Sequence, residues 1–335
     1  MKRRNYLFIL AFALILMPLT LAHVPQKSGV NDSLDNPLFI GDPLKSWVFY
    51  SELTHSEDAR YYELVLDAGE RLKISILTPE SGQFSPRFIL SSENIVSNVI
   101  LPEYLEVHEG HGTLDIGENK SGPEYEPFTP GAYYETAEHT EILEDGGTYY
   151  VIVYEENGLT GSFGLVVGYQ ELFSPLEIVR VPIDTIWIHR WEGQSYLGIF
   201  YPMAIVVIIG LYYIFSRIGK DGRPKDFMGL VTSIIGFAYI GSGAIFINQI
   251  IYAASRTGYS NMMVISFLFV SLPLILGITL IRFGFSDRTK YDVYVRLRPL
   301  TYGILGLFTW SGIIVFPILC ILMSFFPQKL ISRKP

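Results

Sequence analysis

The stretch GGTYYVIVYEENGLTGSFGLVVGY, residues 146–169, contains two strand-like segments on either side of the turn EENGLTG. Aromatic and β-branched residues recur in both segments, and these residue types fit best on the pleated surface of a β-sheet. The glycines and the asparagine between the segments are typical of a turn. This stretch therefore predicts two successive β-strands.

Two earlier stretches follow the same pattern. The segment ARYYELVLDAGERLKISILTP (59–79) alternates apolar and polar residues on both sides of an Ala-Gly turn, and KSWVFYSEL (45–53) is a further strand candidate. No sustained helical period occurs between residues 23 and 190. We therefore expect the first half of the chain to be an all-β, jelly-roll-like antiparallel sandwich.

The segments YYELVLDAGERLKISILTP and GTYYVIVYEENGLTGSFGLVVG resemble the front and back of the bacterial pre-peptidase C-terminal domain, a small β-sandwich. The resemblance covers residues 60–168, and residues 91–140 depart from it because they are long and rich in Glu, Gly, Pro and Tyr. It implies an accessory module of the kind linked to secreted enzymes, with no catalytic residues to transfer. The whole chain looks like a membrane-anchored protein of the cell envelope.

Four apolar runs in the second half are long enough to cross a bilayer. They cover residues 196–216, 227–253, 262–285 and 300–326. None of them has an ionisable residue at its middle, so an anchor or assembly domain fits better than a conduit for ions or protons. We therefore expect an α-helical domain of four membrane-spanning helices after the β-sandwich.

The first residues have the features of a signal peptide. A basic MKRR is followed by the apolar YLFILAFALIL (6–16), and small residues precede an expected cleavage after Ala22. An uncleaved anchor is the alternative, and it exports the same half. Basic residues follow the first and third apolar runs, which places those loops in the cytoplasm. We thus predict a multi-pass plasma-membrane protein with its N-terminal domain outside, although four spans leave a basic tail (327–335) outside too.

Charge divides the chain as sharply as hydropathy does. Between His23 and Gly193 there are 29 acidic and 9 basic residues, a net charge of −20, whereas the remainder carries +12. An acidic half of this size would repel phosphate backbones, which argues against nucleic-acid binding. The expected partners are therefore the lipid bilayer and another protein of the envelope.

The expected organisation joins a signal peptide, an extracytoplasmic β domain, an interfacial linker, four helices and a tail. Their boundaries are 1–22, 23–180, 181–195, 196–326 and 327–335. In the linker, Trp187 and Trp191 suit the lipid headgroup layer, and His189 between them is either part of that anchor or a partner-binding or gating residue.

Histidines offer the main candidates for metal chemistry. HEGHG (108–112) is not a zincin motif, because His108 and His111 are three residues apart instead of four, so it is either a surface loop or half of another metal site. A processed amino-terminal His23 could bind copper through its amine and ring, with His108 or His111 completing the site. We keep this copper-handling function as an alternative and predict no metal site or cofactor.

Nucleophile elbows, phosphate loops and Cys-x-x-Cys pairs are absent from the sequence, and its one cysteine, Cys320, lies in an apolar run. Asn31 and Asn119 stand in glycosylation sequons. We therefore predict no catalytic residues and a non-enzymatic binding or assembly module. A second alternative is an accessory subunit of a membrane transporter or enzyme complex.

Overall fold

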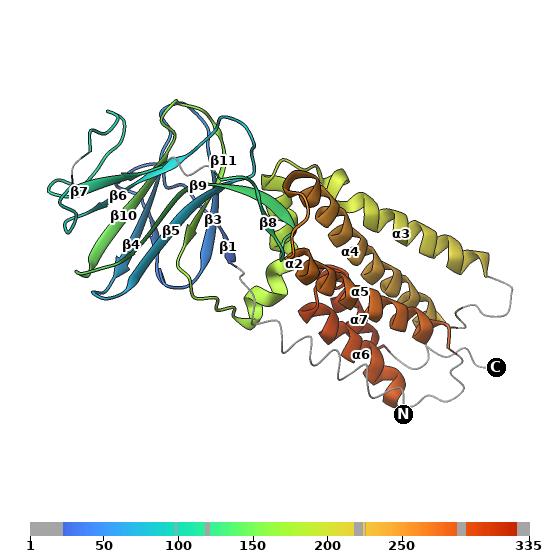
Figure 1. Ribbon diagram of the computed structural model, residues 1–335. Coiled ribbons are helices and arrows are strands. Elements are labelled where there is room, and N and C mark those ends of the chain that lie inside the picture. Colours follow the sequence, from blue (N-terminus) through green and yellow to red (C-terminus); the bar gives the residue numbers. More distant parts are fainter. Residues whose placement is uncertain are drawn as a thin grey trace. The chain divides into compact units, whose positions relative to one another are not determined.

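The computed structural model describes residues 23–97, 99–117, 121–217, 224, 226–286 and 293–326, which form two compact units (Figure 1). In the described part of the chain, the β unit contains residues 23–126 and 132–173, and the helical unit contains 127–131 and the residues from 174 onward. The expected signal peptide, Asn119 and the basic tail lie outside the described residues.

Eleven strands in the described part of the β unit form two sheets. The six-stranded sheet has the order β1 (Val24–Lys27), β3 (Trp47–Leu53), β11 (Gly161–Val167), β5 (Arg71–Thr78), β9 (Gly131–Ile142) and β8 (Glu124–Glu126). The five-stranded sheet has the order β2 (Leu38–Ile40), β4 (Arg60–Leu66), β10 (Gly147–Tyr154), β6 (Arg87–Ser92) and β7 (Gly112–Ile116).

The β-rich first half is confirmed, and so are the two successive strands predicted in each of 59–79 and 146–169. The two strands of each stretch do not pair with each other, because they belong to different sheets. Strand β10 pairs with β4 and β6, whereas β11 pairs with β3 and β5. Each strand turns alternate side chains toward the other sheet, as Tyr62 and Leu64 do from β4 and Phe163 and Leu165 do from β11. The apolar pattern of 146–169 thus supplies both sides of one hydrophobic core.

The sheets are mixed, although the sequence predicts antiparallel ones. Strand β1 runs parallel to β3 and strand β2 runs parallel to β4, and each forms one edge of its sheet. Both strands are short and precede the stretches that the sequence predicts as strands. Their alternation of apolar and polar residues is too short to predict a strand.

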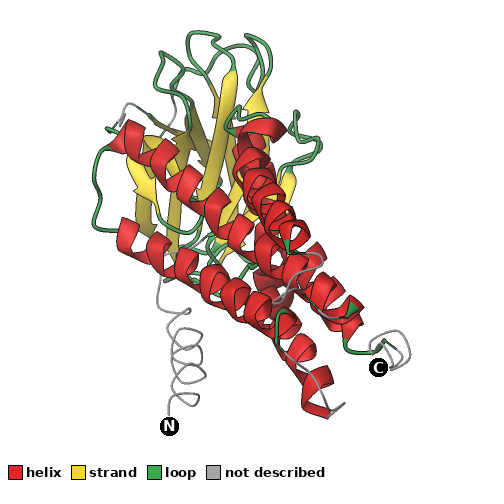
Figure 2. Cartoon of the chain, turned by 90° about the vertical axis from the view of Figure 1, so that its right-hand side faces the viewer, coloured by secondary structure: helices red, strands yellow, loops and turns green. Residues whose placement is uncertain are grey.

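Helices α2–α7 make up most of the described helical unit (Figure 2). They are α2 (Pro175–Trp191), α3 (Tyr196–Ser216), α4 (Phe227–Thr257), α5 (Met263–Gly284), α6 (Val293–Phe308) and α7 (Val315–Met323). Three of them, α3, α4 and α5, are long and apolar enough to cross a membrane. The chain is therefore a membrane protein by the length and composition of its helices, and the first three expected spans are confirmed as helices.

The expected fourth span, residues 300–326, does not form one helix. Helix α6 ends at Phe308, the next six residues form a turn, and α7 begins at Val315. Within this run, a Cβ added at Gly303 would meet the carbonyl oxygen of Pro317 and the side chain of Ile321, so α6 and α7 pack side by side. Residues 300–326 therefore form a helical hairpin. The prediction of a fourth membrane-spanning helix is wrong because the chain turns between α6 and α7.

Both ends of the hairpin lie at the same end of the helical unit. Arg298 stands 5.5 Å from the ring of Phe283, near the end of α5, and Phe326 is 6.2 Å from Phe227, at the start of α4. The turn lies deep among the helices, because Gly312 N–H donates to Ser242 Oγ (2.8 Å), halfway along α4. The hairpin therefore enters the unit and returns, as a re-entrant segment does.

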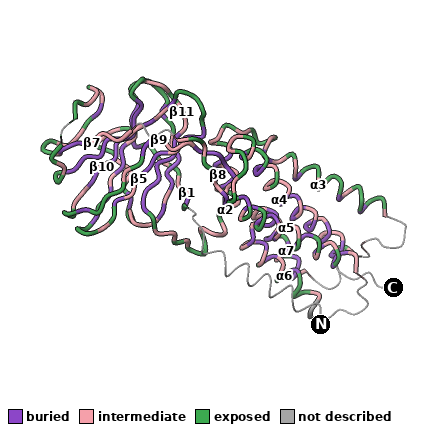
Figure 3. The backbone as a smooth tube through the Cα atoms, viewed as in Figure 1, coloured by how far each residue is buried: buried purple, intermediate pink, exposed green. Residues whose placement is uncertain are grey.

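Helices α4 and α5 form the packed centre of the unit, whereas α3 is mostly exposed (Figure 3). Gly236 and Gly277 face each other across the α4–α5 contact, and a Cβ on either one would clash with the carbonyl oxygen of the other at 2.6–2.7 Å. Small residues of this kind let two membrane helices approach closely. The exposed apolar side chains of α3 suit contact with lipid.

Asp58 organises the turn between β3 and β4 in the β unit. Its carboxylate accepts hydrogen bonds from Thr54 N–H (2.7 Å) and Thr54 Oγ1 (2.9 Å) and pairs with the Arg60 guanidinium. Burial raises the pKa of Asp58, but these hydrogen bonds and the Arg60 charge outweigh it, so the pKa lies below its usual value. The folded state therefore stabilises the ionised carboxylate.

Replacing Asp58 with Asn should weaken the β unit at neutral pH by about 2 kcal/mol, because the charged acceptor is lost. The folded-state pKa is depressed, so the wild type holds this stability above the unfolded pKa and loses it as the pH falls below about 4. Hydrogen exchange of β4 amides should show a gap between wild type and variant at pH 7 that closes in acid. Asp67→Asn, at an exposed position, is the control, and a pH-independent gap would contradict the assignment.

The hairpin predicts that reporters placed after Arg217 and after Phe326 lie on the same side of the membrane. A reporter after Gly258, in the loop between α4 and α5, should lie on the opposite side. The measurement is the activity of paired reporters that fold on only one side of the membrane. If the reporters after Arg217 and Phe326 lie on opposite sides, residues 300–326 cross the membrane after all.

Candidate functional site

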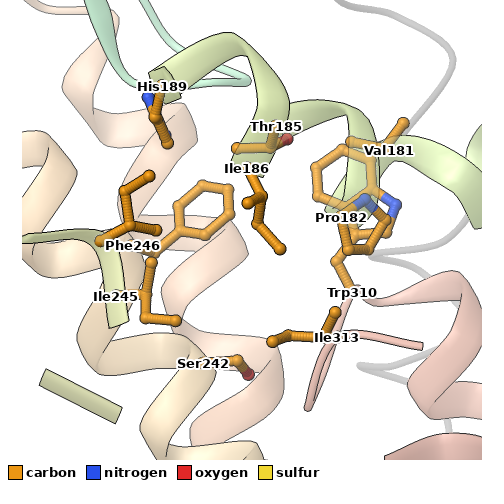
Figure 4. A pocket seen from close by; sticks show the side chains of 11 residues that line it. Val181, Pro182, Thr185, Ile186, His189, Ser242, Ile245, Phe246, Trp310 and Ile313 are labelled. Carbon is orange, nitrogen blue, oxygen red and sulfur yellow. The ribbon is translucent and has the colours of Figure 1, made fainter. Parts of the chain in front are cut away.

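A pocket in the helical unit lies between α2, α3, α4 and the α6–α7 turn (Figure 4). Its volume is about 40 Å³, enough for more than one water-sized group. The lining is mostly apolar, with hydroxyls at Thr185 and Ser242 and the ring of His189. The apolar and aromatic side chains are Val181, Pro182, Ile186, Ile199, Ile245, Phe246, Trp310 and Ile313.

Two pocket residues on the α6–α7 turn have backbone angles that ordinary side chains avoid. Trp310 has φ 55° and Ile313 has φ 58°, and positive φ is particularly unfavourable for a β-branched residue. Gly312 between them has φ 75°, which glycine adopts without strain. Strained backbone of this kind persists only where the surroundings hold it, and it concentrates at functional sites.

The surroundings of Trp310 show what holds the turn. Its ring stacks on Phe269 at 4.6 Å between centroids and lies 6.5 Å from Phe246. Its indole Nε1–H donates to the carbonyl oxygen of Ile178 in α2 (2.9 Å). The tryptophan therefore ties α2, α4 and α5 to the tip of the hairpin.

Polar groups at the turn satisfy one another inside the helical unit. Ser242 Oγ accepts from Gly312 N–H and donates to the carbonyl oxygen of Tyr239 (2.7 Å). The hydroxyls of Thr309 and Ser311 are 2.9 Å apart. An unpaired backbone group costs several kcal/mol in an apolar medium, so these contacts allow the helix to break at depth.

His189 and Glu192 form a buried pair at the end of α2. The His189 Nδ1 and Glu192 Oε2 atoms are 2.9 Å apart, and both side chains are 1% exposed. Gln194 Nε2 donates to the same carboxylate oxygen (3.0 Å) and exchanges two hydrogen bonds of 2.9 Å with Gln249 of α4. This network links the end of α2 to α4 through side chains alone.

The network leaves one polar atom beside the pocket unsatisfied. Glu192 can only accept when ionised, so His189 Nδ1 carries the hydrogen of the contact. The other ring nitrogen, Nε2, is buried and has no hydrogen-bond partner among the described residues. The site therefore combines apolar walls, a carboxylate-oriented imidazole and a strained turn, which suits a small apolar molecule with a single polar group.

The sequence-predicted histidines are divided between regions of the β unit. His23 is exposed, and its Nδ1 lies 2.5 Å from Ser46 Oγ beside β3. The rings of His108 and His111 lie 5.2 Å apart between centroids, so the HEGHG segment does bring its two histidines together. Within the described ranges, no group of three His, Cys, Asp or Glu side chains is placed to hold a metal ion.

The other predicted residues have clear positions. Asn31 is 1% exposed, and the amide nitrogen that a glycan would occupy donates to the carbonyl oxygen of Tyr61 (2.9 Å). Trp187 and Trp191 are half-buried on α2, which begins at a Ser174 capping box inside the expected β domain. Cys320 is buried on α7.

Sequence reasoning identified His189 but missed Trp310 and Ile313. Both missed residues lie in the apolar run 300–326, whose hydropathy is uniform enough to predict a membrane-spanning helix. The signal that was available is the Thr-Trp-Ser-Gly sequence at 309–312, where small and polar residues interrupt the run. Such residues near the middle of an apolar segment are compatible with a turn between two short helices.

Comparison with protein-family models and with curated proteins finds no match for this chain.

Replacing Glu192 with Ala should lower the stability of the helical unit by about 3 kcal/mol, because it leaves a buried imidazole unpaired. Asp184→Ala is the matched control on the same helix, since Asp184 pairs with the half-exposed Arg180 at 3.5 Å and such pairs contribute less than about 1 kcal/mol. Thermal unfolding in detergent measures both losses. Equal losses in the two variants would show that the His189–Glu192 pair has no special role.

Proposed function

We propose that this chain is a multi-pass membrane protein of the cell envelope that works by binding, not by catalysis. Its acidic β unit lies outside the cytoplasm and contacts a partner protein, and its helical unit anchors it and holds a small apolar ligand. The observation that carries the proposal is the pocket where an apolar lining, two strained residues and a buried histidine meet.

The charge distribution supports this orientation. Basic residues follow α3 and α5 in the sequence, and the positive-inside rule places those loops in the cytoplasm. The hairpin returns Phe326 to the same end of the unit, and the basic Lys329, Arg333 and Lys334 follow it in the sequence. With three spans and a hairpin, the tail no longer opposes the rule.

The β unit supports partner binding through its acidic character. Glu124 and Glu135 stand on the neighbouring strands β8 and β9, and Glu138 follows on β9. Burial raises the pKa of Glu135, and the charges of Glu138 and Glu124 raise it further. A basic patch on a partner would relieve this repulsion between like charges. The resemblance to the pre-peptidase C-terminal domain, itself a proposal, agrees with an accessory binding module.

The pocket supports the ligand part of the proposal by its chemistry. Apolar walls favour transfer of an apolar group out of water, and the small volume limits that group to a short aliphatic segment or an apolar atom the size of xenon. The buried His189 offers one directional contact within this lining. Such a combination can bind a molecule and orient it through one polar contact.

Filling the pocket should abolish ligand binding, with xenon as the probe because it is apolar and small enough for a pocket of about 40 Å³. Wild-type protein in nanodiscs should show a saturable rise in the unfolding temperature of the helical unit, since a ligand that binds only the folded state stabilises it. Ile245→Phe places a ring in the pocket and should remove the rise. The measurement is thermal unfolding at increasing xenon pressure.

The control is Ile208→Phe on α3, at a side chain that is 64% exposed and does not line the pocket. This variant should keep the wild-type response, which separates pocket binding from partitioning of xenon into lipid. An equal response in Ile245→Phe and wild type, or none in wild type, would remove the basis for a ligand pocket.

A further inference from the structure

The HEGHG segment forms a tight turn that presents two histidines on one side. His111 N–H donates to the carbonyl oxygen of His108 (3.2 Å), and Gly110 at the third position of the turn has φ 87°. A turn with a left-handed third residue is the arrangement that glycine favours. The two-residue gap in His-x-x-His is the gap found between the paired cysteine ligands of many zinc sites, which shows that a turn of this length can direct two side chains to one ion.

The separation of the two rings is the one that a shared metal ion requires. A metal 2.0–2.1 Å from an imidazole nitrogen lies about 3.2 Å from the ring centre, so two rings at a tetrahedral or square angle stand about 5 Å apart. The observed centroid distance is 5.2 Å, with the ring planes 53° apart. Little rearrangement of the ring centres is therefore needed for both rings to bind one ion.

An independent observation points to a missing ligand at the same place. His111 Nδ1 is buried and has no hydrogen-bond partner in the described part of the chain, and the whole side chain is only 9% exposed. The ring of Tyr150 on β10 lies beside both imidazoles. Its centroid is 4.6 Å from that of His108 and 5.8 Å from that of His111. The tyrosine holds the rings together, and the unsatisfied nitrogen has a bond left to make.

The surroundings keep the rings ready to coordinate. Burial lowers the pKa of His111, and the nearby His108 lowers it further, which favours the neutral ring that binds metals. Glu93 Oε1 stands 3.9 Å from His111 Nε2 on a side chain that is 84% exposed. This carboxylate faces the ring nitrogen opposite Nδ1, so it can help to orient the ring while Nδ1 stays open for an ion.

We propose that His108 and His111 form a binding site for one divalent late transition-metal ion, with Cu²⁺ held most tightly. The two imidazoles supply nitrogen ligands, with the unsatisfied Nδ1 as the ligand atom of His111, and water completes the coordination. Imidazole and oxygen donors suit Cu²⁺, which also stands highest among the divalent first-row metals in affinity for such sites. This site uses the turn alone and is independent of His23 and of the pocket in the helical unit.

The test uses the full-length protein purified without a histidine tag and freed of metal by a chelator. Titration with Cu²⁺, followed by calorimetry and electron paramagnetic resonance, should show one equivalent bound with a spectrum split by two imidazole nitrogens. The double variant His108→Ala, His111→Ala should bind Cu²⁺ at least tenfold more weakly. His23→Ala and His139→Ala should bind as wild type does, since His139 contacts Glu141 on β9 in the other sheet.

Three results would overturn the proposal. They are no binding to the wild type, unchanged binding in the double variant, and loss of binding in His23→Ala. The spectrum of the wild type tests nitrogen ligation without any substitution, so it decides the matter if the double variant unfolds. A wild-type spectrum with no imidazole nitrogens would reject the site.

Discussion

The requirement that buried backbone groups find partners shapes the helical unit. Residues 300–326 are apolar enough to span, yet the chain turns back at depth. The turn is tolerated because Ser242 accepts the Gly312 N–H, and because Trp310 joins the backbone of α2 through its indole. Non-helical backbone is possible at such depth only where protein surrounds it. The packed α4–α5 pair, with its facing glycines, provides part of that surrounding.

The same requirement explains the composition of the pocket. Breaking the helix brings two residues with positive φ next to α2 and leaves space that side chains do not fill. The cost of that strain is offset by stacking of Trp310 on Phe269 and by the hydrogen bonds of the turn. At the end of α2, the Glu192 carboxylate orients His189 and connects through Gln194 to Gln249. A ligand site here thus depends on contacts between segments more than 50 residues apart.

The sequence predicted what depends on local periodicity. The strands in 59–79 and 146–169 and the helices from Tyr196, Phe227 and Met263 are visible as alternation or as apolar length. What it could not supply depends on distant partners. The parallel edges β1 and β2 take their order from β3 and β4, and the hairpin depends on Ser242, 70 residues away. Hydropathy averages over the short polar break at 309–312, so a re-entrant segment and a span look alike in it.

The two candidate sites differ in a way that follows from their settings. In the helical unit, His189 is held by a carboxylate within an apolar lining, so its chemistry is limited to one directional contact. In the β unit, His108 and His111 stand on a turn beside Tyr150, where water can join them. Metal ions need several donors and lose much hydration energy on burial, whereas apolar molecules gain from it. The histidine turn is therefore suited to an ion and the pocket to an apolar molecule, and neither setting would serve the other ligand.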